Sequence, residues 1–240
     1  MFATRLERLD RLPNFEHGVT LGDFFVPIRV GERASAWQRH LVLVVMGSLL
    51  IVAGAYVSFP VPQIQLPGIY LPANPYVPFS LQTFAVLFTG ATLGFRRGVA
   101  ATILYLLMGA VGLPVFAVDA SGAHAAGMDT IVSVAQGRVV LGATGGYLVG
   151  FVFAGAIAGT LAEHGWDRTL RGSLAAMFIA NVAIYVVGVP WLAVAAHLTI
   201  PQTLQAGLYP FIPGDLLKLA IAAGLLPVGW WFVRRRAHDL

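Results

Sequence analysis

Long apolar runs separated by short polar stretches dominate the chain from residue 41 onward. Each run approaches the roughly 20 residues that an α-helix needs to cross a bilayer, so the pattern predicts membrane-spanning helices. Six spans are expected, at residues 41–59, 79–95, 98–118, 139–162, 173–198 and 213–233. The second and third are separated only by "RRG" at 96–98, which predicts a tight helical hairpin.

The first 36 residues have a different character. They contain five arginines and five acidic residues, and they lack the apolar core of a secretory signal peptide. We predict a polar cytoplasmic extension at residues 1–36, partly disordered or lying on the membrane surface. It is followed by a six-helix transmembrane substrate-binding domain at residues 37–240.

Composition agrees with a membrane protein of the all-α class. Hydrophobic residues make up 58% of the chain and charged residues 11%, with a mean hydropathy of +0.77. A soluble domain has roughly a quarter charged residues. The net charge of +4 comes from arginines at loop positions and not from a basic-aromatic surface, so nucleic acid is not an expected partner. Cysteine is absent, which excludes disulfides and thiolate metal sites.

The arginines also predict the orientation, because cytoplasmic loops hold an excess of Arg and Lys. With the N-terminus inside, eight basic residues flank the spans on the inner side and two on the outer side. The inner ones are Arg39, Arg96, Arg97, Arg168, Arg171, Arg234, Arg235 and Arg236, and the outer ones are Arg138 and Lys218. Both termini are therefore expected in the cytoplasm. The uncharged, Pro-rich segment 60–78 then lies outside, where it can cover a pocket.

Two charged residues fall at the mouth of the last span. Asp215 and Lys218, the only lysine, are three residues apart in "PGDLLK" and so share one helix face. Charged groups inside a membrane segment are costly and usually face a cavity or a partner. The pair is either an internal tie for the helix or a polar recognition group for a small ligand.

Other polar groups lie inside the spans. Glycines at four-residue intervals in "GATGGYLVG" (142–150) favour helix packing, with Thr144 and Tyr147 as possible pocket groups. Gln82, Thr83 and Tyr185 are candidates for either an interhelical hydrogen bond or a ligand contact. Arg138 could anchor the interface or bind an anion. No Walker motif occurs in the sequence, so any ATP-driven work needs another chain.

Several stretches together resemble the BioY family, the biotin-specific S components of energy-coupling-factor (ECF) transporters. They are "VPFSLQTFAVLFTGATLGFRRG", "YLLMGAVGLPVF", "GATGGYLVGF", "YVVGVPWL" and "PFIPGDLLK", in this order. The resemblance covers residues 41–235 and leaves out the N-terminal extension. Ala143 stands where the family usually has proline.

This resemblance implies a compact six-helix fold with a biotin pocket near the outer surface, covered by the loop between the first two helices. It implies a multi-pass protein of the prokaryotic cytoplasmic membrane that takes up biotin with a transmembrane coupling subunit and two ATPase subunits. It implies no cofactor, no metal and no enzymatic activity. Asp215 and Lys218 would hold polar groups of biotin, with other residues near the ligand: Gln82, Thr144, Gly145, Tyr147 and Tyr185. We add Arg138 on its chemistry alone.

Small residues are also expected on the first span for docking to the coupling subunit, where Gly54 and Ser58 are candidates. Three alternatives remain open: an S component for another vitamin or for a metal ion, an intramembrane enzyme, and a purely structural subunit. The enzyme is disfavoured because "PGD" lacks the first glycine of a GxGD motif and a second intramembrane aspartate, and no GxSxG elbow occurs.

Overall fold

The computed structural model describes residues 19–25, 36–61, 63–66, 69–71, 73–135 and 137–238. Within these ranges, five helices are long and apolar enough to cross a membrane. They are α3 (Ala36–Tyr56), α4 (Gln82–Ala110), α5 (Gly145–Glu163), α6 (Leu170–Ala195) and α8 (Ile212–His238). The protein is thus mostly helical, as predicted, while the exact number of crossings stays a prediction.

Helix α4 is a helical hairpin rather than one straight rod. Gly94 interrupts it with a left-handed backbone conformation (φ 82°, ψ 178°), which glycine adopts without strain. Beyond this point the chain reverses its direction. The close approach of the two arms shows this, since a Cβ added to Gly98 would lie 2.9 Å from the Cα of Gly90. The side chain of Gln82 also donates a hydrogen bond to the Tyr105 hydroxyl across the hairpin. In a continuous helix these two residues would be about 35 Å apart.

The predicted hairpin is therefore confirmed, but the predicted turn was three residues late. Arg96, Arg97 and Gly98 belong to the second arm, and the reversal occurs at Gly94. The Glu163 carboxylate on α5 accepts a hydrogen bond of 2.8 Å from the amide of Phe95 and so satisfies a backbone donor at the start of that arm.

Three two-stranded antiparallel sheets join the helices, and no strand was predicted from the sequence. They pair β1 (Ser58–Val61) with β4 (Asn74–Ser80), β2 (Ile64–Leu66) with β3 (Ile69–Leu71), and β5 (Val132–Ala135) with β6 (Arg138–Leu141). The predicted spans 41–59, 98–118 and 139–162 were thus wrong at one end each, since α3 ends at Tyr56, α4 ends at Ala110 and α5 begins at Gly145. Prolines prevent a helix around 60 and 75–78, and the Val-rich stretches at 132–134 and 139–140 favour strands.

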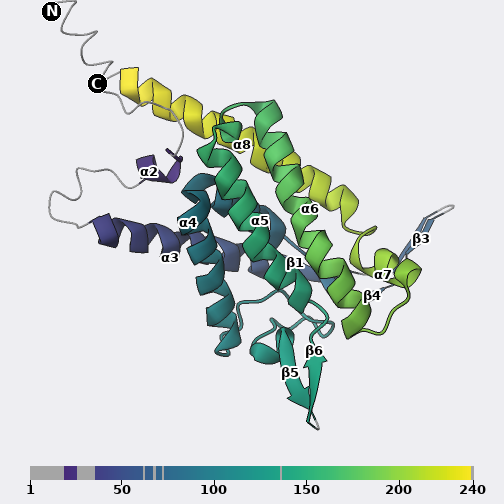
Figure 1. Ribbon diagram of the computed structural model, residues 1–240. Helices are drawn as coiled ribbons and strands as arrows, with labels where there is room; N and C mark the ends of the chain where they lie inside the picture. Colours follow the sequence, from purple (N-terminus) through teal and green to yellow (C-terminus); the bar gives the residue numbers. More distant parts are fainter. Residues whose placement is uncertain are drawn as a thin grey trace, which may run out of the picture.

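The small elements divide between the two ends of the helices (Figure 1). Strands β5 and β6 lie at one end with α7 (Ile200–Gly207) and the 3₁₀ helix η2 (Met128–Thr130), and we call this the sheet end. Helix α2 (Gly22–Phe25) lies at the opposite end with the last turns of α8, and we call this the α2 end. The 3₁₀ helix η3 (Trp166–Arg168) connects α5 to α6 there.

Small residues allow the central helices to touch, as the glycine spacing predicted. A Cβ on Gly90 of α4 would lie 2.6 Å from the carbonyl oxygen of Gly155 on α5, and one on Gly150 would lie 3.0 Å from the backbone of Ile184 on α6. Gly54 of α3 behaves in the same way, because its added Cβ would meet Ala85 at 2.8 Å. Gly54 therefore faces α4, and the prediction that it serves an external docking surface is wrong. Ser58 lies in β1, where its hydroxyl accepts a hydrogen bond of 3.1 Å from Val118 N.

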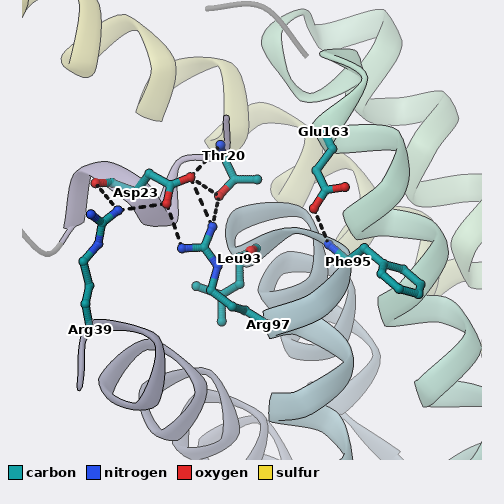
Figure 2. A network of polar contacts seen from close by, with 7 residues as sticks. All are labelled: Thr20, Asp23, Arg39, Leu93, Phe95, Arg97 and Glu163. Carbon is teal, nitrogen blue, oxygen red and sulfur yellow. Dashed lines mark hydrogen bonds and ion pairs between the residues drawn. The ribbon is translucent and has the colours of Figure 1, made fainter. Parts of the chain in front are cut away.

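The α2 end is held together by one carboxylate. Asp23 accepts hydrogen bonds from Arg39 on α3 at 2.9 Å and from Arg97 on α4 at 2.8 and 3.1 Å (Figure 2). It also caps its own short helix by accepting from the amide and hydroxyl of Thr20. Burial raises the pKa of Asp23, but the hydrogen bonds and charge of Arg97 outweigh that effect, so the net pKa is below its ordinary value.

Apolar contacts accompany this network. Leu21 is 3% exposed and belongs to the main core, and the ring of Phe24 packs edge-on against Trp230 of α8 with centroids 5.9 Å apart. Residues 19–25 of the predicted polar extension are thus packed on the helix ends. Ala36 is the first residue of α3, and the other residues of the extension lie outside the described ranges, so the extension as a separate unit stays a prediction.

Candidate functional site

A cavity of about 520 Å³ lies at the sheet end. That volume is within the range of roughly 300–1,000 Å³ that small-molecule sites occupy. Its wall is formed by β4, the first turn of α4, the loop 116–130, and the adjoining parts of α5, α6 and α8. The segment 60–78 thus contributes to the wall through residues on β1 and β4, as predicted for a covering loop.

The buried carboxylate of Asp215 lies in this wall. The helix α8 begins at "IPGD", where proline suits the first turn and the amide of Asp215 donates to the carbonyl of Phe211 at 2.8 Å. Asp215 is 4% exposed. One of its oxygens accepts from Asn181 at 3.2 Å and from the Tyr185 hydroxyl, both on α6. Its other oxygen is 3.0 Å from the ammonium nitrogen of Lys218.

The ammonium of Lys218 joins α8 to α4. It donates to the hydroxyl of Thr83 at 3.2 Å and to Asp215 at 3.0 Å. An ammonium has three N–H donors, and two of them are used among the described residues. Lys218, Asp215 and Thr83 all line the cavity. A structural role and a ligand-binding role for this pair are therefore compatible. The pair joins the helices, and its remaining donor and acceptor positions are available at the cavity.

Gln82 is buried beside this pair and shows the same double character. Its amide nitrogen donates to Tyr105 on the other arm of α4, and its oxygen accepts from the Ser80 hydroxyl at 3.3 Å. It also lines the cavity. The interhelical hydrogen bond expected for a lone buried amide is therefore present, and the second N–H of the amide has no partner within the described part of the chain.

The start of α5 brings three predicted residues to different positions. Thr144 precedes the helix and lines the cavity, as does Tyr147, whose hydroxyl donates to the carbonyl of Gly207 at 2.8 Å. Gly145 is buried behind them, where an added Cβ would lie 2.8 Å from the Ile131 carbonyl oxygen and 3.0 Å from Trp191. Its backbone packs tightly, and it does not form part of the cavity wall.

Arg138 is not brought together with the other candidates. It begins strand β6, its side chain is exposed, and it lies outside the cavity wall. Tyr185, by contrast, lines the cavity next to Asp215. Six of the eight predicted residues therefore line one cavity: Asp215, Lys218, Gln82, Thr144, Tyr147 and Tyr185.

Several wall residues were missed from the sequence. Asp119, His124 and Asp129 line the cavity, and none of them is among the predicted site residues. Both carboxylates are exposed, while His124 is half-buried and its ring stacks on Tyr56 with centroids 4.1 Å apart. The spacing of these residues carries no local signal, because the bridge between Val118 and His124 folds the loop back on itself.

Asn74, which holds strand β4 in place, is another wall residue that the sequence did not predict. Its amide nitrogen donates to the carbonyl of Ala206 on α7, and its oxygen accepts from the amides of Tyr76 and Val77 at 2.9 and 3.3 Å. The apolar part of the wall includes Phe116 and Phe151. The cavity therefore combines a small cluster of polar groups with apolar and aromatic surfaces, as ligand sites usually do.

The fold and this cavity define an integral membrane protein with a cavity of ligand-binding size near one end of its helices. Residues 30–235 match the BioY family, and the chain belongs to that family. This result bears out the resemblance seen in the sequence. The members compared here are transporters and not enzymes.

Two relatives give the extent of the similarity. The biotin transporter BioY of Thermotoga maritima is 34% identical over 186 residues, which are 78% of this chain and 92% of that protein. The biotin transporter BioY of Rhizobium etli is 33% identical over 192 residues, which are 77% and 89%. A crystal structure of the S-component for biotin from an ECF-type ABC transporter has the same fold, with a TM-score of 0.61 and 22% identity. That match covers 81% of this chain and 93% of the other.

Proposed function

We propose that this chain binds biotin with high affinity and mediates its uptake as the S component of an ECF transporter in the cytoplasmic membrane of a prokaryotic cell. The observation that carries the proposal is the Asp215–Lys218 pair in the wall of a 520 Å³ cavity. The biotin transporters among its relatives support the choice of ligand.

The chemistry of biotin suits this wall. Its ureido ring needs both donors and acceptors, which Lys218, Thr83 and Asp215 can supply from their remaining bonding capacity. Its thiophane ring and alkyl chain need apolar surface, which Phe116 and Phe151 supply. Hydrogen bonds to charged groups contribute about 1.5–3 kcal/mol each, so this polar cluster would account for much of the selectivity.

Energy for transport must come from other subunits. The sequence contains no Walker motif, and the family match supports a partner set of one transmembrane coupling subunit and two cytoplasmic ATPase subunits. The arginine distribution supports an orientation with the α2 end in the cytoplasm and the cavity toward the outside. Residues 1–36 would then be a cytoplasmic extension.

The proposal is tested by replacing Lys218. Lys218→Met removes the ammonium but keeps most of the length of the side chain, and we expect biotin affinity to fall about 10- to 100-fold, the equivalent of one lost charge-assisted hydrogen bond. Calorimetric titration of the purified protein in nanodiscs measures the effect. Arg138→Met is the matched control, because it removes a basic group outside the cavity wall. Unchanged affinity in a folded Lys218→Met protein contradicts the assignment.

A panel of vitamins separates the remaining alternatives. We expect biotin to raise the melting temperature of the protein, while thiamine, riboflavin and a divalent metal ion leave it unchanged. A larger shift with another member of the panel would identify an S component of different specificity. No shift with any of them would favour a structural subunit.

A further inference from the structure

We propose that the mouth of the cavity selects against a negatively charged tail, so that biotin derivatives with the carboxyl group masked as an amide, such as biotinyl-lysine, bind at least as tightly as free biotin. This inference rests on the proposed function. The structure supports it through the charges of the cavity wall, the hydrogen bonding of His124 and the position of Arg138.

The charges of the wall do not balance. The wall contains three carboxylates, on Asp119, Asp129 and Asp215, and a single ammonium, on Lys218. That ammonium is 3.0 Å from Asp215, so the inner end of the cavity is neutral as a whole. The two remaining carboxylates are exposed and therefore mark the mouth. Asp119 is held ionised, because hydrogen bonds from the hydroxyl and amide of Ser121 lower its pKa.

His124 adds a further acceptor at the same place. Its Nδ1 is 2.9 Å from the carbonyl oxygen of Phe116. A carbonyl oxygen can only accept, so Nδ1 carries a proton, and in the Nδ1–H tautomer Nε2 has a lone pair. The ring is fixed by stacking on Tyr56. The histidine thus offers an acceptor, as the two carboxylates do, and this set of groups complements a donor such as an amide N–H or an ammonium.

No cation of the wall compensates for these charges. Arg138 is the remaining basic residue on the side predicted to be outside, and it lies exposed on β6 and beyond the wall. The segment 60–78 contains no charged residue at any position. If the ureido ring occupies the polar inner end, the tail of biotin points toward the acidic mouth. There a carboxylate is repelled, whereas an amide is not.

Three ligands with the same ring system test this inference: biotin, biotinamide and the amide of biotin with ethylenediamine, with tails of charge −1, 0 and +1. We titrate each into the purified chain in nanodiscs of zwitterionic lipid, at low and at high salt. At low salt, biotinamide should bind about three- to tenfold tighter than biotin and the amine tighter still, as expected for exposed charges a few ångströms apart. At high salt the differences should shrink, because the Debye length falls to a few ångströms.

Variants connect the effect to the mouth. Asp129→Asn and the double variant Asp119→Asn/Asp129→Asn should tighten biotin binding relative to the binding of biotinamide. Arg138→Gln is the matched control outside the wall and should leave the order of affinities intact. The inference is overturned if biotin binds tighter than both derivatives at low salt, or if the order persists in the double variant. Failure of all three ligands to bind would overturn the proposed function itself.

Discussion

Asp23 and Asp215 lie toward opposite ends of the helices, and both join separate helices through a carboxylate. Asp23 is bonded by two guanidinium groups, from Arg39 and Arg97, and its neighbours are backbone and packed side chains (Figure 2). Asp215 is bonded by one ammonium and two neutral donors, Asn181 and Tyr185, and it lines a cavity. The Asp23 side chain accepts five hydrogen bonds and the Asp215 side chain three, and the two networks also differ in what surrounds them.

That difference distinguishes a structural network from a binding network. A guanidinium that bonds in a fixed fork leaves little freedom, and the donors around Asp23 converge on oxygens outside the wall of the 520 Å³ cavity. A lysine has three mobile donors, and here only two are used. A ligand can therefore join the Asp215 network without breaking it, and the apolar wall beside it supplies the rest of the contact.

The largest expected effect is on ligand affinity, which should depend on Asp215 and not on Asp23. Asp215→Asn keeps the shape of the side chain but weakens the bond to Lys218 and any hydrogen bond to the ligand. We expect biotin affinity to fall at least about 100-fold, the equivalent of two charge-assisted hydrogen bonds. Calorimetric titration measures the loss. A similar loss in Asp23→Asn, measured in the same way, would break the distinction between the two networks.

The second prediction concerns stability. Asp23→Asn should lower the free energy of unfolding at neutral pH by about 1–2 kcal/mol, because two partly exposed ion pairs are lost, and it should leave biotin affinity unchanged. The pKa of Asp23 is lowered by folding, so its contribution is present above the ordinary pKa of 3.8 and is lost as the pH falls through the folded-state pKa. The stability difference from wild type should therefore narrow below about pH 4.

Denaturation of the detergent-solubilised protein at several pH values measures this difference. Glu163→Gln is the control at the same end, because the amide oxygen can still accept from Phe95 N and no ion pair to Glu163 occurs within the described residues. A pH dependence as large in Glu163→Gln as in Asp23→Asn would contradict a specific role for the two arginines.

The sequence was sufficient for the spans and for the chemistry of the inner site. Apolar runs near helical length need no tertiary information to be recognised, and charged residues inside such a run point to a site on energetic grounds. Asp215 and Lys218 were therefore found by composition and spacing alone. Tyr185, Tyr147 and Thr144 followed from family motifs, and the structure places all five in one cavity wall.

What the sequence could not give depends on long-range folding. Several glycines lie near the hairpin, and nothing local shows that Gly94 adopts the left-handed conformation. The Val-rich strands β5 and β6 are as apolar as a membrane helix, so span four was started too early, and Arg138 was placed beside the site when it lies on an exposed strand. The contact of Asp23 with Arg97 joins residues 74 positions apart.

A third carboxylate gives the smallest and most specific prediction. Asp167, in η3, is 1% exposed and accepts a hydrogen bond from the indole of Trp230, but it forms no ion pair within the described residues, and one of its oxygens has no partner there. Burial raises its pKa to about 6. The charge of Arg168 lowers this pKa, but it does not outweigh burial as Arg97 does at Asp23.

Because this pKa exceeds the ordinary value of 3.8, the folded protein holds the proton more tightly than the unfolded chain between the two values. Stability from this group is full below about pH 4 and is lost as the pH rises through 6. Asp167→Asn keeps an acceptor for Trp230 and does not titrate, so wild type should lose about 1–2 kcal/mol relative to the variant between pH 5 and pH 7. Chemical denaturation at both pH values measures the difference. A constant difference would show that Asp167 is stabilised in its charged form, and the contrast with Asp23 would then disappear.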